Sequence, residues 1–217
     1  AGIGLTGSRM PLAAALLCIA VGLVLRRRWR LLIVLVTLAG LAGALVALSD
    51  VGRLAAQRGD SLRGAIWQQY LPRVADSPWL GEGLLTDETT QLPAGTAESA
   101  PTVILHPHNA YLATALYGGL PALAMLLAMI FRAVGEGRRS AATGDPVWLL
   151  LLLFSLLCML TDGDRLLNAP RAIWFYFWLP VGVLIARDAA RTAATVAVPV
   201  PVGDAGALGH VPAHRTE

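Results

Sequence analysis

The sequence predicts an all-α fold, a polytopic membrane helix bundle of about five transmembrane helices with a long periplasmic loop. Two observations predict it. The hydrophobic fraction is 56% and the charged fraction 14%, well below the roughly 25% charge of soluble domains. Long apolar runs also recur along the chain, and most charged residues lie between them. A bundle of membrane-spanning helices accounts for both features.

Five apolar segments are the predicted spans. They cover residues 10–25, 31–48, 110–132, 146–161 and 172–187. The third is the longest, and at about 1.5 Å per residue it reaches roughly 34 Å, enough to cross a hydrocarbon core of about 30 Å. The first, fourth and fifth reach only about 24 Å, so they need flanking residues or a locally thin bilayer. We expect one membrane domain over residues 1–191.

The orientation of these spans follows from arginines in the short connections. The connections carry Arg26, Arg27, Arg28 and Arg30, then Arg132, Arg138 and Arg139, and finally Arg187 and Arg191. Basic residues in short loops mark the cytoplasmic side. The amino end, the 49–109 loop and the 162–171 loop then lie on the opposite face of the membrane. In a bacterium that face is the periplasm, and the predicted location is then the inner membrane.

The 49–109 loop is too long to be a plain connection. In SLRGAIWQQYLPRVADSPWLGEGL, apolar residues at Leu62, Ile66 and Tyr70 have helical spacing, which predicts an amphipathic helix on the membrane surface. The following TDETTQLPAGTAESAPT is acidic and has no periodicity, so we expect a mobile segment or lid.

The two ends of the chain carry separate expectations. The start, AGIGLTGSRMP, has neither an initiator Met nor a signal-peptide pattern, so we expect the C-terminal part of a longer protein. Residues 192–217 lack a core-forming pattern and are predicted to be a disordered cytoplasmic tail.

Two arginines lie at the predicted outer face. Arg9 is in LTGSR at the outer end of the first span. A charge at membrane depth costs at least about 2.5–3.5 kcal/mol on insertion scales, so Arg9 is paired, functional, or extended to the interface. Arg63 lies on the predicted surface helix, four residues before Trp67, and is either a solvated loop arginine or a functional one.

His108 and Asn109 directly precede the third span. As an N-cap, Asn109 would present the N–H groups of residues 110–112 and the positive end of the helix dipole, which favours an anion. The alternative is a plain cap beside an ordinary interfacial histidine. The topology places His108 at the same face as the two arginines, and this set suits a phosphate-bearing lipid that is bound and then attacked.

Other polar residues give weaker indications. His106 and His108 have no carboxylate or Cys at ligand spacing, so no metal site is predicted. Gly118, Gly119 and Pro121 would either kink the third span or allow close helix packing through small residues, and the second is favoured.

The last predicted outer loop carries charged residues, and an aromatic run follows it. Asp164 and Arg165 belong to a solvated charge cluster or approach the same site as His108. The WFYFW run at 174–178 predicts an aromatic belt at the outer interface, or a contact to a lipid chain or sugar. The arginines form no stripe, so no nucleic-acid partner is expected.

Three stretches carry motifs in a fixed order, namely LTGSRMPLAAALL, SLRGAIWQQYLPRVADSPWLGEGL and HNAYLATALYGGLPA. They contain a T-x-S-R helix, an R-x-x-x-W segment ending in G-x-G, and an HN-x-YL helix with a glycine eleven residues after the His. This set resembles the C-terminal half of the bacterial O-antigen ligase and O-antigen polymerase superfamily. Gly119 stands at that glycine, and Ala122 replaces the Gly or small residue that follows. The resemblance covers about residues 5–187.

The resemblance implies a metal-independent, cofactor-free, GT-C-like glycosyltransferase. Such enzymes move a glycan from undecaprenyl pyrophosphate to an acceptor. The acceptor is the lipid A core for ligases, a protein hydroxyl for oligosaccharyltransferases, and another lipid-linked glycan for polymerases. A lipid or anion transporter subunit is the non-enzyme alternative, but transporters need polar residues near mid-membrane and the spans here have almost none.

The resemblance also assigns roles to residues. The family's His and two Arg map onto His108, Arg63 and Arg9. The arginines would hold the donor pyrophosphate, and the imidazole would take the proton of the acceptor hydroxyl in one inverting step. The remaining substrate-binding residues are predicted to be Trp67, Asn109, Tyr111 and Arg165.

Overall fold

The structure is a computed structural model that describes residues 9–49, 63–87, 89–92, 102–161, 163, 166 and 172–196. Its elements are α2 (Arg9–Leu25), α3 (Trp29–Leu48), α5 (Arg63–Asp76), β1 (Thr90–Leu92), β2 (Thr102–Ile104), α6 (Ala110–Ala142), α7 (Val147–Met159), the π-helical turn η1 (Trp174–Trp178) and α8 (Leu179–Val196). The molecule is an all-α membrane helix bundle with one small sheet.

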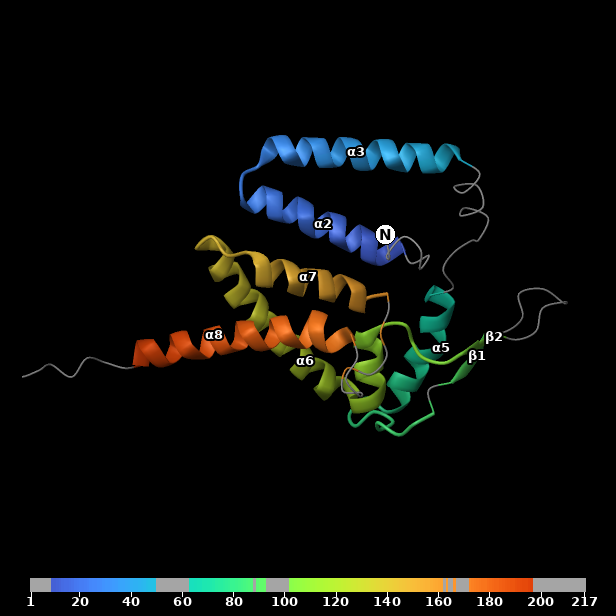
Figure 1. Ribbon diagram of the computed structural model, residues 1–217. Helices are drawn as coiled ribbons and strands as arrows, with labels where there is room; N and C mark the ends of the chain where they lie inside the picture. The colour runs from blue at the N-terminus through green and yellow to red at the C-terminus, as the bar shows by residue number, and fades with distance from the viewer. Residues whose placement is uncertain are drawn as a thin grey trace, which may run out of the picture.

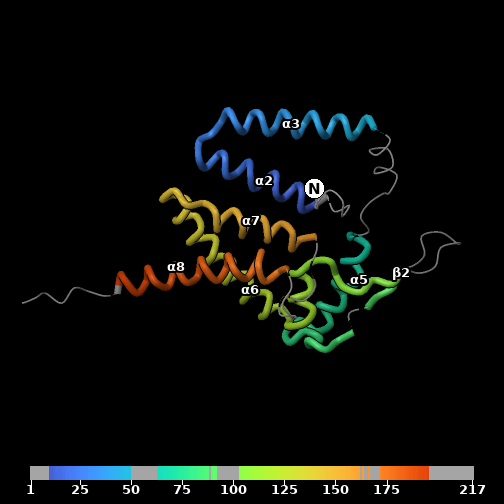
Figure 2. The backbone as a smooth tube through the Cα atoms, in the orientation of Figure 1, coloured from blue at the N-terminus to red at the C-terminus, as the bar shows by residue number. Residues whose placement is uncertain are grey.

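The long helices run back and forth in alternating directions (Figures 1 and 2). One end of the bundle, here named the His108 end, gathers the starts of α2 and α6, the end of α7, and α5 (Figure 1). The opposite end, here named the arginine end, holds the α2–α3 turn, the α6–α7 turn and the end of α8. The three arginine clusters therefore lie at one end of the molecule, although only the first has residues in a connection, since α6 and α8 extend past the other two.

The helices differ in their capacity to cross a bilayer. Among the described helices, α3 and α6 are long and apolar enough to do so, while α2 and α7 are shorter apolar helices. Helix α3 has no buried residue, and side chains such as Ile33 and Leu45 are more than 60% exposed. An apolar helix exposed along its whole length suits a lipid environment.

The main core joins α6, α7, η1 and α8. Its most buried members include Leu152, Phe177 and Leu184. Phe177 lies inside this core, so the predicted aromatic belt is limited to the exposed Trp174 and Phe175 of the same turn. Packing against α6 and α7 thus overrides the interfacial preference of part of the WFYFW run.

Helix α6 is interrupted at Gly119, which has φ 71° and ψ −175°. Pro121 lacks an N–H and its ring crowds the carbonyl four residues earlier, so regular helix is unfavourable there. The released groups bond to the segment before β1: Leu120 N–H donates to Pro78 O (2.7 Å), and Gly83 N–H donates to Tyr117 O (3.0 Å). The favoured prediction of helix packing at these glycines is wrong, because a loop backbone occupies the place of a neighbouring helix.

Two further predictions need correction. Residues 90–92 pair with residues 102–104 as antiparallel strands, although the segment was expected to lack structure. The β-branched Thr90, Thr102, Val103 and Ile104 favour strands, and such short strands need no visible alternation. Helix α8 also continues to Val196, beyond the predicted start of the tail at residue 192. Residues 93–101 and 197–217 lie outside the described residues.

Candidate active site at the His108 end

The first part of α6 provides the platform of the site. Ile66 and Tyr70 of α5 are buried against Ala113 and Leu116 of α6 and against Ile104 of β2. The apolar face that the sequence predicted for this helix is therefore present. It packs on protein, whereas the sequence analysis placed it on the membrane surface.

Two side chains one turn apart fasten α5 to the rest of the site. The Trp67 indole N–H donates to the carbonyl oxygen of Pro107 at 3.2 Å. The Arg63 Nε–H donates to the carbonyl oxygen of Thr161, just after α7, at 2.9 Å. The i, i+4 spacing of the R-x-x-x-W motif places both residues on one face of the helix. Trp67 thereby ties α5 to the residue before His108, and Arg63 ties it to the end of α7.

His108 has an unusual backbone conformation. Its φ is 51°, in the left-handed region that non-glycine residues occupy at a cost of about 1–2 kcal/mol. The fully buried Pro107 precedes His108. The backbone N–H of His108 donates to Nδ1 of His106 at 3.3 Å. The two imidazole rings lie 3.9 Å apart between centroids. A strained residue held by its neighbours is typical of functional sites.

Asn109 caps α6, as the sequence predicted. Its Oδ1 accepts the N–H groups of Tyr111 and Leu112, both at 3.0 Å. The cap therefore occupies two of the N–H groups that were expected to meet an anion. Of the three N–H groups that the sequence offered to an anion, only that of Ala110 is not used by this cap.

The other predicted site residues are placed as follows. The Tyr111 hydroxyl donates to Leu156 O of α7 at 3.2 Å, so it joins two helices. Helix α2 begins at Arg9, at the same end of the bundle as α5 (Figure 1). Gly163 crosses the start of α6 so closely that an added Cβ would lie 3.1 Å from Ala110 Cβ. Arg165 lies outside the described residues.

Two polar clusters were missed from the sequence. Near the site, the Arg73 guanidinium makes a two-point contact with the Glu82 carboxylate, with N–O distances of 2.9 and 2.5 Å. Thr86 Oγ1 donates to the same carboxylate at 3.0 Å. The hydrogen bonds from Arg73 lower the pKa of Glu82. Arg73 and Glu82 are nine residues apart in the sequence, a separation that no local pairing rule covers, so the contact can be seen only in the folded structure.

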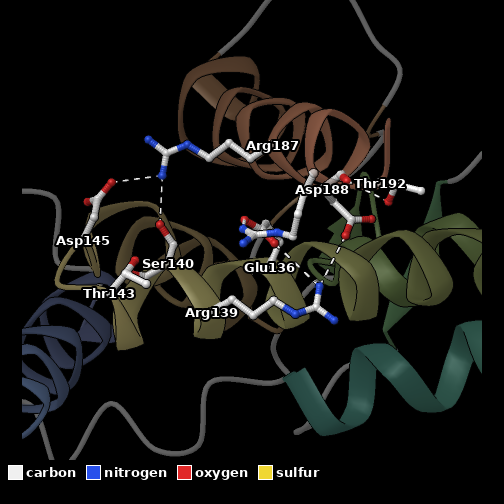
Figure 3. A network of polar contacts seen from close by, with 9 residues as sticks. Glu136, Arg139, Ser140, Thr143, Asp145, Arg187, Asp188 and Thr192 are labelled. Carbon is white, nitrogen blue, oxygen red and sulfur yellow. Dashed lines mark hydrogen bonds and ion pairs between the residues drawn. The ribbon is translucent and has the colours of Figure 1, made fainter. Parts of the chain in front are cut away.

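The second cluster joins α6 to α8 at the arginine end (Figure 3). Asp188 contacts Arg132 at 2.7 Å and Arg139 at 3.4 Å. Arg187 donates to Asp145 at 3.0 Å, and Arg191 pairs with Glu136, which is 1% exposed. The sequence predicted from these arginines only the orientation of the spans in the membrane, and their carboxylate partners were not predicted.

Comparisons with known proteins agree with the motifs. The family model for O-antigen ligase matches residues 1–127, which include Arg9, Arg63, His108 and Gly119. An O-antigen ligase of Pseudomonas aeruginosa PAO1 is 32% identical over 191 residues, which is 83% of this chain and 43% of that protein. The chain thus spans less than half the length of this relative. No solved structure matches the present chain. With the family model covering more than half of the sequence, the chain belongs to the O-antigen ligase family.

Proposed function

We propose that the chain forms the transfer site of a membrane glycosyltransferase of the O-antigen ligase type. The donor is a glycan on undecaprenyl pyrophosphate, and the acceptor is a hydroxyl of the lipid A core. Family membership supports the reaction class. The arginine end belongs on the cytoplasmic side, which orients the His108 end toward the periplasm of the inner membrane. The observation that carries the proposal is the Trp67–Pro107 hydrogen bond, which joins the helix that carries Arg63 to the residue directly before His108.

Arg63 is the proposed ligand of the donor pyrophosphate. The bond from its Nε to Thr161 O fixes the guanidinium plane. Its two terminal nitrogens make no hydrogen bond to any residue that the structure describes, so that edge is available for two phosphate oxygens. Arg9, at the start of α2, supplies the second cation. Together they stabilise the negative charge that the pyrophosphate gains as the glycosidic C–O bond breaks.

His108 is the proposed general base. The acceptor oxygen attacks the anomeric carbon, its proton passes to the imidazole, and the electron pair of the broken C–O bond leaves with the pyrophosphate. The configuration at the anomeric carbon inverts in this single step, and the imidazole then returns its proton to water. No metal ion is required, because the leaving group is already good and the arginines meet its charge.

The proposed substrate contacts follow from which atoms are already bonded. The polar atoms of Trp67 and Tyr111 are used within the protein, so their rings are the surfaces for sugar or lipid. Oδ1 of Asn109 is the cap acceptor, which leaves its amide nitrogen for the substrate. Arg165 completes the set as a further proposed cation.

The test compares His108→Ala with His106→Asn in cells that lack the intact gene and are complemented with each variant. Lipopolysaccharide and undecaprenyl-linked glycans are resolved together. We expect His108→Ala to lower transfer by about 10²–10⁴ and to accumulate long lipid-linked glycan beside a bare lipid A core. His106→Asn keeps an acceptor for the His108 N–H and is expected to retain most of the transfer.

The pattern of products separates the outcomes. Normal transfer in the His108→Ala strain removes the base role. A lipid A core carrying a single repeat unit identifies a polymerase. An unchanged lipopolysaccharide pattern together with loss of another glycan product identifies a different acceptor, such as a protein hydroxyl.

A further inference from the structure

A cavity of about 480 Å³ lies at the arginine end, on the opposite side of the molecule from His108. One wall is the α2–α3 turn, which contributes Arg26 and Arg28 together with leucines. The other wall is the α6–α7 turn, which contributes Ala141, Gly144 and Pro146. The cavity therefore combines two arginines with leucines and small residues in its lining, at the level where the apolar helices α2 and α3 meet.

The two arginines at this cavity are less compensated than most others at the same end. Four of the five arginines of α6 and α8 pair with carboxylates, namely Arg132 and Arg139 with Asp188, Arg187 with Asp145, and Arg191 with Glu136. Of the described side chains, none forms an ion pair or hydrogen bond with the guanidinium of Arg28. Arg26 has a longer-range attraction to Asp145, whose carboxylate is already bound by Arg187.

We propose that this cavity binds the phosphate headgroup of an anionic phospholipid. Two arginines facing one space suit a phosphodiester, which accepts several charge-assisted hydrogen bonds. Leu23, Leu25 and Leu31 in the lining suit the glycerol and upper acyl carbons of a lipid. Basic pockets between membrane helices on the cytoplasmic side bind anionic headgroups in this manner. Free phosphate would satisfy the arginines and leave the leucines without a partner.

A headgroup in this position would connect two parts of the bundle. It would contact both the α2–α3 turn and the α6–α7 turn. Near the same level, Gly22 of α2 approaches α7 so closely that an added Cβ would lie 3.0 Å from Leu150 Cδ1. The lipid would therefore hold α2 against α7, and α2 is the helix that begins at Arg9 at the other end.

The experiment uses the whole chain purified in a neutral detergent and measures retained lipid by native mass spectrometry. Dioleoylphosphatidylglycerol is the anionic probe, dioleoylphosphatidylcholine the zwitterionic one, and inorganic phosphate the free anion. We expect Arg26→Gln/Arg28→Gln to weaken binding of the anionic lipid about tenfold or more. Arg27→Gln/Arg30→Gln removes the same charge from neighbouring residues outside the cavity lining and should weaken lipid binding less than about threefold.

A second variant tests the shape of the cavity without changing its charge. Ala141→Phe places a ring in the space and should also abolish retention of phosphatidylglycerol. Equal loss in both double arginine variants would show general attraction to a basic turn and overturn the site. Wild-type binding by Arg26→Gln/Arg28→Gln would overturn it as well. Displacement of the bound phosphatidylglycerol by an equal concentration of inorganic phosphate would replace the lipid with a free anion.

Discussion

At the scale of single residues, two glycines allow two backbone segments to lie directly against each other. An added Cβ at Gly81 would lie 2.5 Å from the carbonyl carbon of Tyr117, and one at Gly119 would lie 2.5 Å from the carbonyl oxygen of Trp79. Both glycines also have positive φ. Glycine is required here for two reasons at once, the left-handed backbone and the space for a peptide group.

Gly81→Ala is therefore expected to destabilise the fold by about 2–4 kcal/mol, through backbone strain and overpacking together. Gly83→Ala is the matched control. Gly83 also has positive φ, but an added Cβ there meets nothing within 4 Å, so we expect only the strain of about 1–2 kcal/mol. Titration with SDS in mixed micelles, followed by circular dichroism, gives both free energies of unfolding. Equal losses in the two variants would show that the close approach to α6 has no energetic role.

At the scale of elements, the segment from Pro78 to Gly83 forms backbone hydrogen bonds with α6 at the break in that helix. Its backbone supplies hydrogen-bond partners where the helix is broken, and the Arg73–Glu82 contact fastens it to α5. The folded-state pKa of Glu82 lies below its ordinary value of 4.5. The carboxylate thus adds stability above the unfolded-state pKa, and this stability is lost as the pH falls through the lower folded-state value.

We expect the difference in melting temperature between wild type and Glu82→Gln to be constant from neutral pH to about pH 5. It should shrink as the pH falls below 4.5, because protonated Glu82 no longer forms the ion pair. Thermal unfolding followed by tryptophan fluorescence measures it. Because other carboxylates titrate equally in both proteins, the difference isolates Glu82. A difference that grows in acid would contradict the assigned contact.

The elements also show what the sequence can and cannot predict. Continuous apolar segments located α2, α3, α6 and α7, and the motif residues at Arg63, Trp67 and Asn109 showed which ends carry polar groups. The break at Gly119 was not resolved, since its partner is a loop about 40 residues earlier and no local rule pairs them. Carboxylate partners such as Glu82 and Asp188 were missed for the same reason, because helix packing decides which charges meet.

At the scale of the whole molecule, the two ends of the bundle differ in the polar groups they carry. The proposed chemistry lies at the His108 end, while α6 and α8 are joined by ion pairs at the arginine end. Within that network Glu136 is 1% exposed, and Arg191 and Arg139 are its basic neighbours. A buried carboxylate that loses its partner is costly, whereas an exposed pair contributes little.

Arg191→Ala is accordingly expected to lower the free energy of unfolding by roughly 1–3 kcal/mol, less than for a fully buried pair because the Arg191 side chain is half exposed. Arg132→Ala removes a 63%-exposed arginine from Asp188, which keeps Arg139, and should cost less than about 1 kcal/mol. SDS titration measures both. Glycan transfer per folded molecule should stay near the wild-type level in each, since neither residue lies at the His108 end. A selective loss of transfer in folded Arg191→Ala protein would show that the arginine end controls the site.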